Sequence, residues 1–184
     1  MSRTSSENPI ATPETGVIRF AREVAHLAAS TPPGRRGTTD FVIELGDRYA
    51  YLRPRDLWRP WRFLRQAASA PPVQLGTAGF RPDILDDYNP ARHYTAFVWA
   101  GFWLPYSLAV MLIYAWEIAG YIRYRGEWSH ADVLCGLIGV RHGRKVRREG
   151  PAVLPGLIAT ELADTHQVDV AALLAEVNQL VGDA

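Results

Sequence analysis

The chain has 184 residues, of which 48% are hydrophobic and 21% are charged, and its formal net charge is +1. This length indicates one domain, the composition is that of a globular rather than a disordered protein, and the net charge gives no general support for nucleic-acid binding. The lone cysteine, Cys135, excludes an intramolecular disulfide framework and a cysteine-rich zinc site.

The N-terminal half predicts one helix, one β-hairpin and an irregular arm. Residues 1–11 look like a polar, flexible tail without an apolar signal core, so we expect a cytoplasmic protein, with membrane association as an alternative. Residues 12–30 repeat apolar side chains at helical spacing. Two β-prone runs around a Gly-Asp pair predict a short β-hairpin over about 41–52. After an arginine-rich helical stretch, residues 70–88 are rich in proline and glycine and predict an irregular arm.

The C-terminal half, residues 90–184, predicts a helical core. Asn89 before Pro90 starts one helix, and Ser129 and Asp169 are suited to cap two others. The run "RKVRREG" predicts a basic loop. We therefore expect a mainly α protein with a single domain over 12–184, organised around an antiparallel helical hairpin at about 90–124, with one short β-hairpin.

Residues 94–116 carry no charged side chain and allow two structures. A single helix of this length would reach about 35 Å, enough to cross a hydrocarbon core of about 30 Å. Pro105 would break or kink that helix, and tryptophans lie centrally where a membrane span prefers aliphatic side chains. A turn at Leu104–Tyr106 between two helices explains Pro105 directly, so we favour a buried hairpin and keep the membrane span as the alternative.

His93 and Glu117 stand at equal distance, twelve residues, on either side of Pro105. In an antiparallel hairpin they would lie at the same height. A histidine beside a carboxylate is a common general base or metal-ligand arrangement, because the carboxylate fixes the tautomer. The alternative is a structural pair, in which the histidine and the glutamate only satisfy each other's hydrogen-bonding groups. Asp132 is the third candidate, although Ser129-x-x-Asp132 also fits a capping box, and His130 is a further candidate ligand.

A resemblance covers about residues 86–145. The order N-P-A-R-H-Y-x-A-F-x-x-x-G-F, then a glutamate in a second helix, then D-x-x-x-G-x-x-G-x-x-x-G, resembles helical domains of bacterial polymorphic-toxin proteins. Gly136 and Trp116 depart from that pattern, where the family often has asparagine and histidine. The resemblance implies a helical domain with a polar His/Glu/Asp cluster and a hydrolytic role. The matching residues are Arg92, His93, Glu117, Asp132, Gly139 and Gly143.

Two basic stretches are candidate binding surfaces. Residues 53–65 combine arginines with aromatic side chains, which suits either a lipid- or protein-binding face or core-facing aromatics with outward arginines. The basic cluster at 141–148 has no interleaved aromatic residues, so a solvated loop competes there with phosphate contacts. The binding residues that we expect are Arg92, Trp58, Trp61, Arg59 and Arg62.

These observations give two function hypotheses. The first is a hydrolase-like or toxin-like helical domain, with His93 as general base, Glu117 orienting it, and Asp132 holding water or a metal. The second is a non-enzymatic subunit that inserts residues 94–116 into a membrane, or docks in a complex, through arginine and tryptophan surfaces. Nucleic acid is the least favoured partner. The sequence does not determine the substrate, the metal, any cofactor or the oligomeric state.

Overall fold

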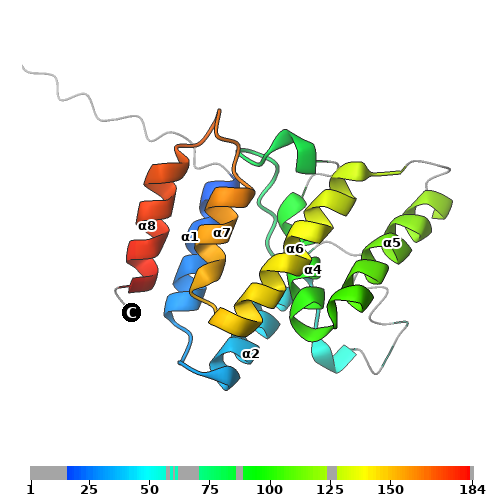
Figure 1. Cartoon of the computed structure of the whole chain (residues 1–184), viewed down its shortest axis with the longest axis horizontal. Coiled ribbons are helices and arrows are strands. Elements are labelled where there is room, and N and C mark those ends of the chain that lie inside the picture. The colour runs from blue at the N-terminus through cyan, green and yellow to red at the C-terminus, as the bar shows by residue number, and fades with distance from the viewer. Residues whose placement is uncertain are drawn as a thin grey trace, which may run out of the picture.

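A computed structural model describes residues 16–56, 59, 61, 71–85, 89–123 and 128–182. The expected tail at 1–11 and most of the arginine-rich stretch lie outside the described residues. Within them the mainly α prediction is confirmed, because they form seven α-helices and no β-sheet (Figure 1). The helices are α1 Gly16–Ala29, α2 Arg35–Leu45, α4 Pro90–Trp103, α5 Tyr106–Arg123, α6 His130–Glu149, α7 Val153–Glu161 and α8 Val170–Gly182.

The helices are arranged across the molecule with α8 at one end and α5 at the other (Figure 1). Helix α1 packs against α7 and α8, whereas α4 packs mainly against α6. Helix α5 contacts α6 more extensively than it contacts α4. The irregular segment 71–85 is confirmed as such, with one 3₁₀ turn at Pro82–Ile84.

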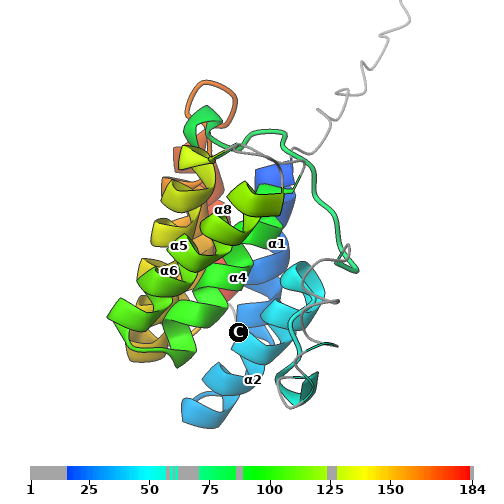
Figure 2. The ribbon, with the colours of Figure 1, turned by 90° about the vertical axis from the view of Figure 1, so that its right-hand side faces the viewer.

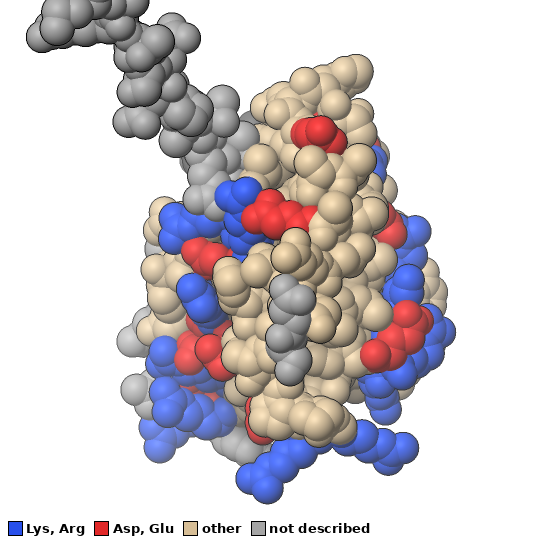
Figure 3. Space-filling view, turned by 90° about the vertical axis from the view of Figure 1, so that its left-hand side faces the viewer, with Lys and Arg blue, Asp and Glu red and all other residues tan. Residues whose placement is uncertain are grey.

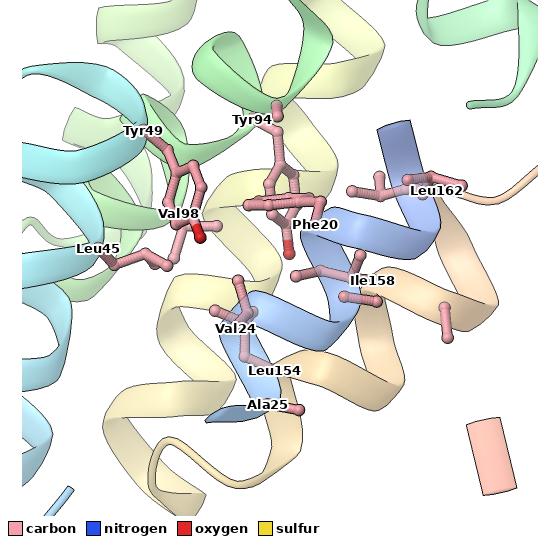
Figure 4. Close-up of a cluster of buried hydrophobic side chains, with 14 of the residues drawn as sticks. Phe20, Val24, Ala25, Leu45, Tyr49, Tyr94, Val98, Leu154, Ile158 and Leu162 are labelled. Atoms are coloured by element: carbon pink, nitrogen blue, oxygen red, sulfur yellow. The ribbon is translucent and has the colours of Figure 1, made fainter. Parts of the chain in front are cut away.

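An aromatic cluster at the centre joins segments that are far apart in the sequence (Figure 4). The ring of Phe20 in α1 makes edge-to-face contacts with Tyr49 at 5.0 Å and with Tyr94 of α4 at 5.9 Å. All three side chains are almost completely buried. Such rings contribute large apolar areas to the core, so this cluster fixes α4 against the N-terminal helices.

The predicted β-hairpin at about 41–52 is wrong, because residues 41–50 are helical. Helix α2 continues into a π-helical turn, Gly46–Ala50, which ends at Tyr51 with φ 59°. The buried side chains Phe41, Val42, Leu45 and Tyr49 recur at helical spacing. Gly46 is needed for close packing rather than for a turn, since a Cβ there would lie 2.7 Å from the Trp99 ring.

The predicted basic loop at 144–150 is also wrong, because α6 continues as a helix to Glu149. The misleading residue is Gly143, which looks like a helix end but lies inside α6. It is buried between the two helices that cross there, and a Cβ on it would lie 2.0 Å from Val98 O of α4. The helix ends instead at Gly150, whose φ of 93° favours glycine.

The uncharged run at 94–116 is divided between α4 and α5, which are separated at Leu104–Pro105 as predicted. The expectation of a buried segment holds for α4 but is wrong for α5, most of which is exposed. Gly101 allows a close approach to Val140 of α6, whereas Gly120 has no neighbouring atom within 4 Å of its would-be Cβ. Among the described helices, none combines the length and the apolar character that crossing a membrane requires.

Candidate functional site

Three helices bring together the three residues that the sequence singled out. His93 comes from the first turn of α4, Glu117 from α5, and Asp132 from the first turn of α6. One potential ligand atom from each lies within 4.8 Å of the other two. Within the part of the chain that the structure describes, this is the one group of three or more His, Cys, Asp or Glu residues in such an arrangement.

Local sequence signals determine where the three residues stand. Pro90 is the first residue of α4 and places His93 three residues further on, at the end of the first turn. Ser129 caps α6 as predicted, since its Oγ accepts a hydrogen bond from the Asp132 backbone N–H at 2.9 Å. On α5 the buried stripe consists of Ala109, Ile113 and Glu117. That spacing of four residues directs Glu117 to the same side as the apolar contacts.

The imidazole of His93 is oriented by the backbone. Its Nε2 lies 3.0 Å from the carbonyl oxygen of Asp132. A carbonyl only accepts hydrogen bonds, so Nε2 carries a proton and donates it. In the neutral ring the lone pair is then on Nδ1, which lies 3.8 Å from Asp132 Oδ1. A histidine that donates one N–H to a carbonyl and presents the other nitrogen is the usual geometry of a metal-binding histidine.

The site is largely withdrawn from solvent. Glu117 is 6% exposed, and the side chains of His93 and Asp132 are 10% and 21% exposed. The ring of His93 also packs on Phe97, with centroids 4.9 Å apart. Two carboxylates at such short range favour the uptake of a proton or a cation, since burial weakens the screening of their repulsion. The arrangement can therefore act as a general base or as a cation site.

Among the described residues, the predicted binding residues are not members of this three-residue group. Arg92 neighbours His93 on α4 and is partly buried. Arg59 is exposed and Trp61 is 81% exposed. Trp58 and Arg62 lie outside the described residues. His130, the further candidate ligand, is exposed at the start of α6 and is not part of the three-residue group.

Sequence reasoning missed a second polar chain, which links α4, α6 and α7. Tyr94 donates its hydroxyl to His142 Nδ1 at 2.8 Å, and His142 Nε2 lies 3.1 Å from Glu161 Oε1. Burial lowers the pKa of His142, and Glu161 only partly opposes this effect. The histidine is therefore neutral at neutral pH. No spacing in the sequence signals these contacts, because Tyr94 and His142 are 48 positions apart.

Comparison with known proteins gives no relative: no family model, curated protein or solved structure matches this chain. The functional interpretation therefore depends on the chemistry of the site itself.

Proposed function

We propose that this protein is a helical hydrolase that uses a divalent metal ion held by His93, Glu117 and Asp132. The observation that carries the proposal is the meeting of these three side chains, within 4.8 Å, from three different helices. The orientation of His93 supports it, since Nε2–H donates to a backbone carbonyl and leaves Nδ1 facing a carboxylate. The polymorphic-toxin resemblance, with its His, Glu and Asp pattern, is part of the same proposal.

The chemistry of the three groups fits a cation such as Zn²⁺ or Mn²⁺. One imidazole nitrogen and two carboxylates leave coordination positions for water, as in catalytic zinc sites with three protein ligands. Ligand atoms at about 2.1 Å from a tetrahedral metal stand about 3.4 Å apart. From separations of up to 4.8 Å the ligand atoms would need to approach by up to about 1.4 Å, which rotation of the two carboxylates would have to supply.

The roles within the site follow from this geometry. A bound divalent ion lowers the pKa of a water molecule and supplies a hydroxide nucleophile near neutral pH. With Nδ1 as a ligand, His93 would hold the ion together with one oxygen each of Glu117 and Asp132, and the second oxygen of one of these carboxylates would accept the proton. Without a metal, His93 would instead be the general base and Glu117 would orient it. These two versions differ in whether a chelator abolishes turnover.

The antiparallel hairpin of α4 and α5 also belongs to this proposal. The two helices are joined at Leu104–Pro105. His93 and Glu117, at equal distances from Pro105, would then stand at one height. Their separation of less than 4.8 Å supports that pairing, although α6 supplies the third wall of the site.

The test is hydrolysis of two chromogenic probes, bis(p-nitrophenyl) phosphate and p-nitrophenyl acetate, by protein stripped with a chelator. We expect turnover to return with Zn²⁺ or Mn²⁺ and to fall at least 100-fold in Glu117→Gln. His130→Ala is the matched control, because it removes a nearby exposed histidine and should change nothing. Turnover that survives chelation but needs His93 would replace the metal with the general-base version. No turnover of either probe under any condition would contradict the hydrolytic role.

A further inference from the structure

The outer surface of α5 carries no charge from Tyr106 to Ile122. The one charged residue in that interval, Glu117, is buried against the neighbouring helices. Nine large apolar side chains of α5 are 43–76% exposed. At about 200 Å² for each side chain, they present about 900 Å² of apolar area, whereas the largest such patch on a typical monomer is about 300–600 Å². Figure 2 shows α5 on the outer face of the molecule.

Apolar exposure is concentrated at this end of the molecule. The exposed large apolar side chains outside α5 are Trp61, Trp103 and Trp128 among the described residues. Trp128 stacks on Tyr114 of α5 with centroids 6.5 Å apart and so extends the same surface. The opposite face, which includes α8, shows acidic and basic side chains mainly around the margins of a broad uncharged area (Figure 3), and it exposes none of these large apolar side chains on α8. What distinguishes the α5 end, among the described residues, is therefore its large exposed apolar side chains.

The side chains of α5 are sorted around the helix. At about 100° per residue, Leu108, Met111, Ile118 and Ile122 point within about 40° of the direction opposite to buried Ile113. Tyr114, Tyr121 and Trp116 lie on the flanks, about 60–100° from Ile113. Four of the five exposed aliphatic residues are thus outermost, the fifth, Leu112, lies on a flank, and these three aromatic residues lie nearer the body of the protein. An interfacial helix has this order, since aliphatic chains enter the acyl region and Trp and Tyr remain at headgroup level.

A basic group adjoins the N-terminal end of α5. The guanidinium of Arg144 lies 5.6 Å from the centroid of the Tyr106 ring. Beside it is a hollow of about 290 Å³, lined by four cationic side chains and by one carboxylate, Glu161. The cationic side chains are Arg141, Arg144, Lys145 and Arg148. This excess of positive charge complements phosphate, and basic residues near an anionic membrane surface are attracted to it.

We propose that α5 docks this protein on an anionic lipid bilayer, lying in the plane of the interface while the basic hollow binds lipid phosphates. The helix is about 27 Å long and would bury its aliphatic face among the acyl chains. A second copy of the chain fits the surface less well. A partner helix would cover one stripe of α5, whereas the apolar surface extends over about 60% of its circumference, and pairing would leave the basic hollow without a role.

The test is co-sedimentation of the full-length protein with vesicles of phosphatidylcholine alone or with about one third phosphatidylglycerol. We expect binding at least tenfold stronger to the anionic vesicles, and weaker binding in high salt. Met111→Glu/Ile118→Glu should reduce binding at least tenfold, as should Arg144→Glu/Arg148→Glu. Ala171→Glu/Ala172→Glu, two exposed positions on α8, is the control for added negative charge and should bind at least three times more tightly than either of those variants.

Size-exclusion chromatography with light scattering separates the outcomes. Binding that disappears in the α5 variant while the protein stays monomeric supports docking on lipid. A dimer that Met111→Glu/Ile118→Glu dissociates, without binding to anionic vesicles, would overturn the proposal and make α5 an interface between copies. Equal binding to neutral and anionic vesicles would overturn the role of the basic hollow. None of these results depends on the metal site, since Glu117 is unchanged in every variant.

Discussion

The closest approach between α4 and α6 predicts a large loss of stability for Gly143→Ala. An ideal Cβ at this position would lie 2.0 Å from Val98 O and 2.8 Å from Phe102 N. Both are backbone atoms of α4, so no side-chain rotation relieves the clash. The two helices must separate by about 1 Å, which is the strain of an overpacked core.

The expected magnitude follows from two opposing effects. Overpacking costs about 1–3 kcal/mol, and a clash with backbone belongs at the upper end of that range. Alanine favours the helical conformation over glycine by about 1 kcal/mol, which offsets part of that cost. The net loss in the free energy of unfolding is therefore about 2 kcal/mol. For a chain of this size that corresponds to a decrease in Tm of about 4–8 °C.

Gly120→Ala is the matched control. It makes the same change inside a helix, but no atom lies within 4 Å of its would-be Cβ. We expect it to stabilise the protein by about 0.5–1 kcal/mol. The assay is urea denaturation followed by circular dichroism at the helical band. If Gly143→Ala were as stable as Gly120→Ala, the tight crossing of α4 and α6 would be refuted.

Three further predictions concern the other polar contacts. Tyr94→Phe removes the hydroxyl that binds His142 and should lower the unfolding free energy by about 1–3 kcal/mol in urea, whereas an unchanged value would contradict this bond. Burial lowers the pKa of His142, so the unfolded chain binds the extra proton, and stability should fall as the pH decreases below about 6.5. His142→Gln should flatten this pH dependence, and an unchanged slope would mean that another titratable group causes it. Arg22 binds Glu176 at 2.5 and 2.9 Å with both side chains partly exposed, so a double-mutant cycle should give a coupling of about 0.5–1 kcal/mol that 1 M salt reduces; zero coupling would mean that apolar packing alone holds α8 to α1.

Local signals in the sequence predicted three of the helix starts. Pro90, Ser129 and Asp169 stand where expected, and Ala172 N–H donates to Asp169 Oδ1 at 3.0 Å. Glycines misled the prediction, because Gly46 and Gly143 resemble a turn and a helix end. Both are instead required by neighbours from other helices, Trp99 and Val98. A single sequence does not distinguish a glycine chosen for its backbone freedom from one chosen for its small size.

The candidate site was partly predictable for a geometric reason. His93 and Glu117 are symmetric in sequence about Pro105, where α4 and α5 are separated, and their ligand atoms lie within 4.8 Å of each other. The exposure of α5 was not predictable, since α4 and α5 are similarly apolar and only their neighbours differ. Helix α4 is enclosed by α6 and the N-terminal segments, whereas α5 buries a narrow stripe. Contacts such as that of Tyr94 with His142 depend on the same tertiary arrangement.

The most direct test of the metal site is calorimetric titration of Zn²⁺ into protein that has been stripped with a chelator. We predict one saturable site per chain, with affinity reduced at least tenfold in each of His93→Ala, Glu117→Gln and Asp132→Asn, and unchanged in His130→Ala. Parallel thermal denaturation should show stabilisation by Zn²⁺ only in the proteins that keep the site. The absence of saturable binding, or equal binding by the three site variants and the native protein, would contradict the account and leave His93, Glu117 and Asp132 as a structural cluster.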